Sequence, residues 1–303
     1  MMRRFLHIAV LACGAAAASR AARCTTVLDP AILREYDNYV AAAERVMPSR
    51  FDAGDLAWLR DPALAPAAAS LAAGKLVRSN ISDAALNQRI AGQNGAVIHW
   101  IGAIRIPRAS LADLRSVLED YGSYDRIYRP LVFACKTRRT ATAPGAVYDV
   151  VMGLRSAFRF ASVFPQHYAF QVTAHIAYTA EPPGASELRV HLAASEIRES
   201  DSGEPGRADF LEPYHDHGIM WALNAYWRAR PRGPDVYLEF ESITLARSVQ
   251  AFACTLGFVP VPKAVVSAAM ESLPQDTLTV ILEATRAECQ RRSSQPPRSV
   301  PVQ

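Results

Sequence analysis

The stretch His217–Arg247, HGIMWALNAYWRARPRGPDVYLEFESITLAR, decides the fold of this chain. Apolar and polar residues alternate in two parts of it, Gly218–Arg230 and Asp235–Leu245, which the turn PRGP joins. A period of two is typical of half-buried antiparallel strands. We therefore predict a long β-hairpin that closes at Arg230 and Asp235.

The predicted hairpin has one apolar face and one polar face. Its register pairs polar residues across the two strands: Arg228 with Tyr237, Tyr226 with Glu239, and Asn224 with Glu241. The apolar face then consists of Ile219, Trp221, Leu223, Ala225, Trp227, Val236, Leu238 and Phe240. Such a register is favoured because it keeps the apolar side chains on one side of the sheet.

Alternation of the same kind occurs through much of the chain before the hairpin, near residues 96–107, 131–139, 148–154, 168–178 and 188–194. In residues 96–107 the odd-numbered and the even-numbered positions are both largely apolar, which predicts that both faces of that strand are covered. Residues 262–292 are predicted to be helical, with Pro274 starting a long helix that can cover the apolar face of the sheet. The sequence thus predicts an α+β fold, in which a curved antiparallel sheet of about six or seven strands grips a long C-terminal helix.

Composition divides the chain into four segments. Residues 1–23 have a positive end, a short apolar stretch and a small-residue cleavage site, as in a secretory signal peptide. Residues 24–95 are predicted to form a helical N-terminal appendage, whose first helix begins at Asp29 and Pro30 and ends at Pro48. Residues 96–292 form the domain with the sheet, and the Ser- and Pro-rich segment 293–303 is predicted to be a disordered tail.

The first segment predicts an exported protein, in the periplasm or outside the cell. A retained N-terminal anchor helix and a lipid anchor at Cys13 are the two alternatives. No later run is long and apolar enough for a transmembrane helix, so contact of the mature chain with a membrane remains possible only without such a helix. The cysteines expected in the mature chain are interpreted as free thiols, with one disulfide as the alternative: Cys24, Cys135, Cys254 and Cys289.

Composition and motifs also exclude several functions. The formal charge is only +4 and no basic stripe interleaved with aromatic residues occurs, so nucleic acid is excluded as a partner. The sequence contains no phosphate-binding glycine loop and no nucleophile elbow, and we assign no cofactor and no catalytic residue. His215 and His217 have no third ligand at a fixed spacing, so we interpret them as loop residues that cap a strand and assign no metal.

The segment IRIPRASLADLRSVLEDYGSYDRIYRPLV, together with the order of elements, resembles the START-like helix-grip (SRPBCC) superfamily. Lipid-transfer proteins and polyketide cyclases are among its members. Several motifs of the hairpin, DHG, LN, YWR and ESI among them, resemble a narrower group of secreted bacterial proteins. The resemblance implies a cavity for a hydrophobic ligand between the sheet and the long helix, and it implies no particular reaction.

Two sets of side chains are candidates for contact with such a ligand. The aromatic set, Trp100, Phe170, Trp221, Trp227 and Phe240, either lines a cavity or packs as core. The polar set, Asn224, Arg228, Glu239 and Glu241, either holds a polar group of the ligand or forms a ladder of ion pairs between strands, in which Arg230 also takes part. In the second case the polar set lies on the back of the sheet.

Three functions remain after these exclusions. The first is a secreted carrier or sensor of a lipid or another hydrophobic small molecule. The second is an envelope interaction protein with a filled core, and the third is a polyketide cyclase/dehydratase-like enzyme that uses the same cavity. The oligomeric state and the identity of the ligand are open.

Overall fold

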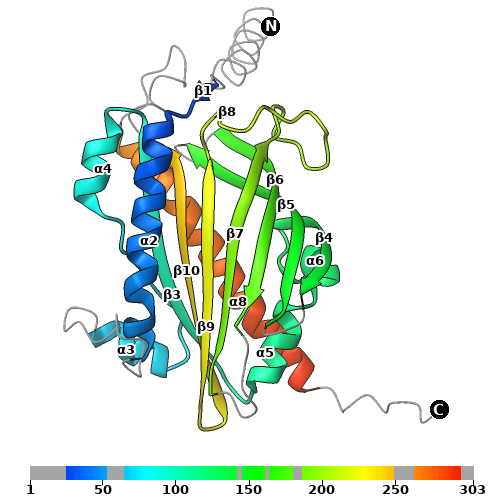
Figure 1. Cartoon of the computed structure of the whole chain (residues 1–303). Helices are drawn as coiled ribbons and strands as arrows, with labels where there is room; N and C mark the ends of the chain where they lie inside the picture. The colour runs from blue at the N-terminus through cyan, green and yellow to red at the C-terminus, as the bar shows by residue number, and fades with distance from the viewer. Residues whose placement is uncertain are drawn as a thin grey trace, which may run out of the picture.

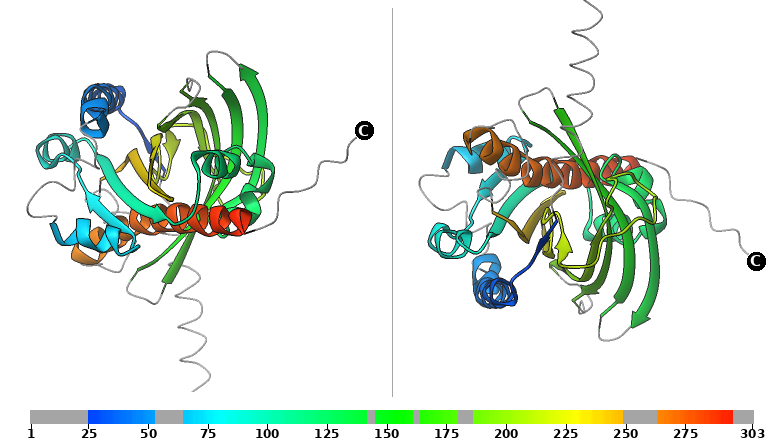
Figure 2. Two further views of the ribbon diagram at one scale, coloured as in Figure 1. Left: turned by 90° about the horizontal axis from the view of Figure 1, so that it is seen from below. Right: turned by 90° about the horizontal axis from the view of Figure 1, so that it is seen from above.

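The computed structural model describes residues 25–52, 65–141, 145–160, 164–179, 186–248 and 263–294. In this part of the chain, eight antiparallel strands form one sheet in the order β2-β3-β10-β9-β7-β6-β5-β4. The sheet curves around the long C-terminal helix α8, as Figures 1 and 2 show. The predicted α+β fold, a curved antiparallel sheet that grips a helix, is therefore confirmed.

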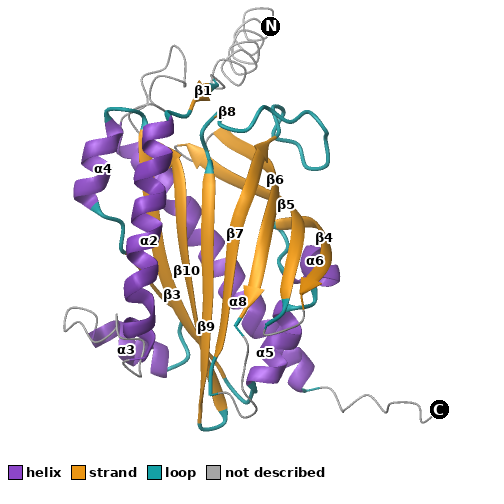
Figure 3. Cartoon of the chain, in the orientation of Figure 1, coloured by secondary structure: helices purple, strands orange, loops and turns teal. Residues whose placement is uncertain are grey.

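The elements follow one another as Figure 3 displays them. The strands of the large sheet are β2 (Val77–Asn80), β3 (Gly95–Ile106), β4 (Val132–Ala141), β5 (Val147–Phe160), β6 (Phe164–Tyr178), β7 (Leu188–Glu199), β9 (Ala222–Arg232) and β10 (Asp235–Arg247). A small separate sheet pairs β1 (Thr26–Val27) with β8 (His215–Asp216). The helices are α2 (Pro30–Asp52), α3 (Ala65–Ala72), α4 (Ala84–Ala91), α5 (Leu111–Leu118), η3 (Tyr121–Ser123), α6 (Tyr124–Ile127) and α8 (Lys263–Ser293).

The hairpin of β9 and β10 has a register that differs from the predicted one by two residues. Arg232 pairs with Asp235, so the turn between the strands holds only two residues. Such short turns suit the twist of paired strands, and Gly233 supplies the positive φ (57°) there. As a result Arg228 lies opposite Glu239, and the predicted partners were wrong. A shift of two residues preserves the alternation of side chains, so the predicted faces of these two strands are largely retained.

The N-terminal segment builds part of the sheet as well as covering it. Strand β2 pairs with β3 at the sheet edge, which brings the strands of the described sheet to eight, above the six or seven expected. Helix α2 packs on the outer face of the sheet, opposite to α8 (Figure 2). Its contacts there are Ile32, Tyr36 and Val40 with Val97, Ile243 and Leu245. Both faces of β3 are thus covered, as its apolar residues at both parities predict.

Two prolines lie inside helices rather than at their ends. Helix α2 starts at Pro30 as expected, where Asp29 accepts a hydrogen bond from the Ala31 amide (2.7 Å). It then continues through Pro48, which removes one backbone hydrogen bond, and Arg50 in the last turn contacts Glu241 of the sheet. Likewise α8 contains Pro274 within one continuous helix and does not start there.

Helix α8 runs close to β3 on the inner face of the sheet. Gly102 permits this approach, because a Cβ atom at that position would collide with Leu278 of α8 and lie 3.1 Å from the Val77 carbonyl oxygen. Further along, α8 is bound to the short helices that close this end of the fold. Its Glu288 accepts a hydrogen bond from Arg126 of α6 (3.0 Å).

Other sequence predictions fall partly beyond the described residues. Residues 1–23, Cys24, Cys254 and all but the first two residues of 293–303 lie outside them. Cys135 and Cys289 are free thiols. Among the described helices, none combines the length and the apolar character needed to cross a membrane.

Candidate functional site

A cavity of about 170 Å³ lies between the inner face of the sheet and α8. Most of its wall is apolar. The lining residues are Ile98, Tyr124, Tyr128, Leu131, Val132, Met152, Leu154, Arg155, Phe170, Ile176, Leu192, Ile219, Met220, Leu223, Ala225, Trp227, Phe240, Ser242, Thr244, Leu273, Pro274, Thr277 and Ile281. Helix α8 contributes Leu273, Pro274, Thr277 and Ile281 to this set.

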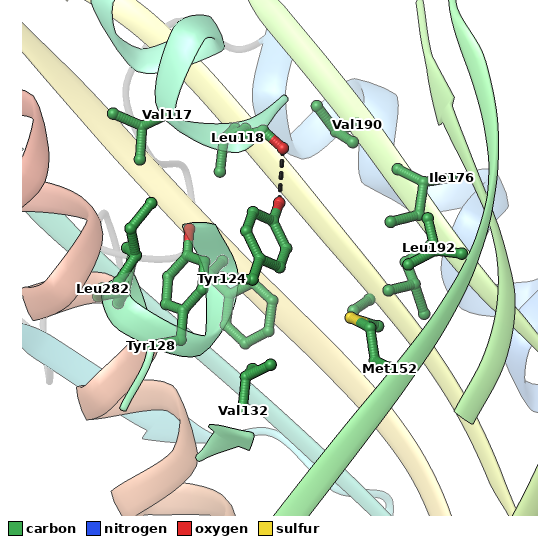
Figure 4. Close-up of a cluster of buried hydrophobic side chains, with 14 of the residues drawn as sticks. Val117, Leu118, Tyr124, Tyr128, Val132, Met152, Ile176, Val190, Leu192 and Leu282 are labelled. Atoms are coloured by element: carbon green, nitrogen blue, oxygen red, sulfur yellow. Dashed lines mark hydrogen bonds between the residues drawn. The ribbon is translucent and has the colours of Figure 1, made fainter. Parts of the chain in front are cut away.

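Two tyrosines of α6 and its C-terminus form one wall of the cavity. Figure 4 shows Tyr124 and Tyr128 facing Met152 and its neighbours across the interior. Tyr124 donates a hydrogen bond to the Leu118 carbonyl (2.5 Å), and the hydroxyl of Tyr128 is 3.2 Å from that of Thr285. Burial raises the pKa of both tyrosines far above the usual value, so both hydroxyls stay protonated. These hydroxyls are engaged in the wall, which presents aromatic rings to the cavity.

The volume limits what the cavity holds. Ligand pockets usually measure roughly 300–1,000 Å³, whereas an apolar cavity of about 150 Å³ is enough for benzene. At about 170 Å³ this cavity fits one compact, ring-sized molecule. A second pocket of about 510 Å³ adjoins it and shares the lining residues Leu131, Arg155, Leu273 and Thr277. The second pocket is more polar, with His167 and Asp276 in its wall.

The residues predicted to contact a ligand separate into three groups. Phe170, Trp227 and Phe240 line the cavity, and the rings of Trp227 and Phe240 are 4.8 Å apart between centroids. Trp100 packs in the same core cluster without lining the cavity. The other five candidates contact the N-terminal segment, one another or the loop before β9, away from the cavity: Trp221, Asn224, Arg228, Glu239 and Glu241.

The buried carboxylate of Glu241 is the centre of a charge cluster on the outer face. Its Oε1 lies 2.7 Å from His99 Nε2 and 2.7 Å from the guanidinium of Arg50, and Arg228 contacts its other oxygen. A carboxylate only accepts, so His99 donates from Nε2, and its Nδ1 lies 2.7 Å from the Tyr39 hydroxyl. Burial alone would raise the pKa of Glu241, but the hydrogen bond from His99 and the two arginine charges outweigh it and lower the pKa to about 2.

The ion pairs of the predicted ladder are only partly present. Arg228 also contacts Glu239 (2.7 Å), and both side chains are almost fully buried. Arg230 instead binds Glu187 at the start of β7 (2.7 Å). The ladder that the sequence suggested on a solvent-exposed face is therefore a buried network beneath α2. Removing one member of a buried network leaves its partners without compensation, which costs more than losing an exposed pair.

Trp221 and the adjacent loop form a second polar cluster. The indole Nε1 of Trp221 donates to Asp216 Oδ1 (2.8 Å), which also accepts from the Gly218 amide (2.7 Å). Nearby, His217 is hydrogen-bonded to Glu199 (2.9 Å). Burial and the negative charge of Glu199 raise the pKa of Asp216 to about 7. Trp221 was expected on the apolar face of the hairpin, but it precedes β9 and packs against α2.

Several cavity residues were not among the predicted candidates. Tyr124 and Tyr128 lie between β3 and β4, and nothing in their spacing placed them opposite the sheet. Ser242 and Thr244 did carry a signal, since they occupy inward positions of β10 after Val236, Leu238 and Phe240. A hydroxyl residue at a position where the pattern predicts an apolar one points to a role other than core packing.

The arrangement is a curved antiparallel sheet closed by one long helix, with a cavity between the two. The chain has the helix-grip fold. No family model matches the sequence, and no curated protein matches it.

Three similar solved structures illustrate the likeness. The Zhui aromatase/cyclase from Streptomyces sp. R1128 is 14% identical, with a TM-score of 0.41, over 67% of this chain and 99% of that one. The STAR-related lipid transfer protein from Xanthomonas axonopodis is 14% identical, with a TM-score of 0.39, over 70% and 98%. The di-domain ARO/CYC BexL from the BE-7585A biosynthetic pathway is 12% identical, with a TM-score of 0.39, over 66% and 51%. This chain thus spans about half of the di-domain protein.

Proposed function

We propose that this protein binds a compact hydrophobic small molecule in the cavity between the sheet and α8. The observation that carries the proposal is the cavity itself, which keeps a volume of about 170 Å³ although large side chains surround it. Protein interiors are otherwise close-packed and an apolar void costs stability, so a void that is retained here favours a role in ligand binding. A filled core, the alternative expected of an interaction protein, has no such space.

The size of the cavity supports a ring-sized ligand over a lipid with two acyl chains. Its aromatic and sulfur-containing wall supports the same choice, because Tyr124, Trp227 and Phe240 present ring faces and Met152 adapts to irregular shapes. The adjoining, more polar pocket supplies a route to the surface at Arg155. Carriage or sensing of such a molecule requires no further chemistry from the protein.

A cyclase-like reaction receives less support from the geometry. The carboxylates of Glu239 and Glu241, a pair that could serve as acid and base, lie on the outer face and are paired with Arg228. They are therefore separated from the cavity by the sheet. We propose binding without turnover.

Native mass spectrometry of the purified full chain tests the proposal. A bound hydrophobic molecule from the host cell should appear as a discrete mass increase that is lost on denaturation. A spectrum of the bare chain alone, in several expression hosts, would contradict the proposal and favour the interaction protein.

Export to the periplasm or beyond is a separate proposal. It is supported by the signal-like residues 1–23 and by the resemblance of the hairpin to secreted bacterial proteins. Cell fractionation of the full chain and of a variant without residues 1–23 tests it. Only the full chain should leave the cytoplasm, and equal distribution of the two would contradict export.

A further inference from the structure

The inner face of β10 changes character where it reaches the cavity. Val236, Leu238 and Phe240 are apolar and almost fully buried, and the next two inward positions are Ser242 and Thr244. Both hydroxyl residues line the cavity and are partly accessible from it. Strand β10 pairs without a bulge through this region, so the inward direction of these side chains follows from the alternation.

The neighbours of these hydroxyls on the sheet are apolar. Across the strand pairs, Ser242 lies opposite Ala225 and Trp100. Thr244 lies opposite Leu223 and Ile98 in the same way. In the part of the chain that the structure describes, neither side chain forms a hydrogen bond. Both side chains are partly exposed toward the cavity, so two hydroxyls without a protein partner on an otherwise apolar wall can bind a polar group of a ligand.

A third polar group lies beside this pair. The indole Nε1 of Trp227 is buried and has no acceptor among the described residues. Trp227 is opposite Phe240 and thus diagonal to Ser242, a separation of roughly 7–8 Å between backbones. The polar atoms on this wall are gathered around Ser242, while the wall of Tyr124 and its neighbours presents rings and apolar chains.

We propose that Ser242 and Thr244 form a subsite for one oxygen function of the ligand, a carbonyl or hydroxyl group on a compact hydrophobic ring. The hydroxyls donate to that oxygen, and the ring lies against Tyr124, Tyr128 and Met152. This assignment rests on the proposed function, since it names the chemical class of the molecule that the cavity binds. It explains why the apolar pattern of β10 stops at the cavity.

A matched pair of probes tests the subsite. Acetophenone and ethylbenzene have the same ring and nearly the same shape, but one carries a carbonyl where the other has a methylene. Titration calorimetry on the full chain gives the ratio of their dissociation constants, in wild type and in the double variant Ser242→Ala/Thr244→Val. Each hydrogen bond contributes about two- to tenfold, so the double variant should shift the ratio toward ethylbenzene by roughly tenfold. The control Ser195→Ala, an exposed hydroxyl on β7, should leave the ratio unchanged.

The outcomes separate the subsite from the proposed function. Failure of both probes to bind wild type would overturn the proposed function and the subsite with it. Binding of both probes with a ratio that the double variant does not change would overturn the subsite alone. Thermal denaturation without probe adds a readout: the double variant should match or exceed the wild-type Tm, because it removes unpaired hydroxyls from an apolar wall. A Tm several degrees lower would show that the hydroxyls serve the fold, and it would overturn the subsite.

Discussion

The guanidinium of Arg50, in the last turn of α2, lies 2.7 Å from the carboxylate of Glu241 in the middle of β10. This contact ties the N-terminal helix to the outer face of the sheet that grips α8. His99 and Arg228 complete the cluster, and the cavity lies on the inner face of the same strands. One sheet therefore separates a structural charge cluster from the candidate ligand site.

Replacing Glu241 with Gln should destabilise the fold without altering the cavity. The change removes the charge that Arg50 and the buried Arg228 share and leaves Arg228 with Glu239 alone, which costs on the order of 3–5 kcal/mol. Urea denaturation measures the loss. The control Glu204→Gln, in an exposed pair with Arg207, should change stability far less. Unchanged stability together with lost ligand binding would place Glu241 in the binding site instead.

The contribution of Glu241 to stability should depend on pH in a defined window. Its pKa in the folded chain is about 2, below the ordinary value of 4.5. A lowered pKa of an acid means that its stabilisation is fully present above pH 4.5 and is lost as the pH falls toward 2. The stability difference between wild type and Glu241→Gln should therefore shrink between pH 4.5 and pH 2. A difference that stays constant down to pH 2 would contradict the ion-pair assignment.

The contribution of Asp216 to stability should change with pH in the opposite direction to that of Glu241, and near neutral pH. Burial and Glu199 raise its pKa to about 7, so its stabilisation is present below pH 3.8 and is lost as the pH rises through 7. Asn at this position keeps an oxygen for the Gly218 and Trp221 donors and carries no charge. Asp216→Asn should be more stable than wild type at pH 8, by on the order of 2–4 kcal/mol, and equal to it below pH 4. Thermal melts across this range check the crossover, and a lower Tm of the variant at pH 8 would be inconsistent with it.

Close approach of α8 to β3 should depend on Gly102. A methyl group there meets Leu278 and the Val77 carbonyl, so Gly102→Ala should cost about 1–3 kcal/mol of unfolding free energy. Gly122 has no atom within 4 Å of an added Cβ and supplies the control. Equal stability of the two variants in urea denaturation would mean that α8 is not held against the sheet at this point.

The sequence predicted the strands well because a period of two is a local signal. The faces of β9 and β10 were correct for most positions, and the register error of two residues came from the unrecognised two-residue turn at Gly233.

What the sequence could not supply was the packing partner of each face. Glu241 is buried beneath α2, where Arg50 contacts it from nearly 200 residues earlier in the chain, so an exposed ladder was the natural interpretation. Trp221 was assigned to the apolar face for the same reason. Ser242 and Thr244 could have been noticed, because they break the inward apolar run of β10.

The most direct test of ligand binding is to fill the cavity. Ala225 is buried, lines the cavity and lies opposite Ser242, so Ala225→Leu places three additional carbons in the space of about 170 Å³. Ala287→Leu, on the exposed side of α8, is the matched control. In native mass spectra of the three full chains, wild type and Ala287→Leu should carry the bound hydrophobic molecule, and Ala225→Leu should be folded and bare. Equal occupancy of Ala225→Leu and wild type would contradict a ligand site between the sheet and α8.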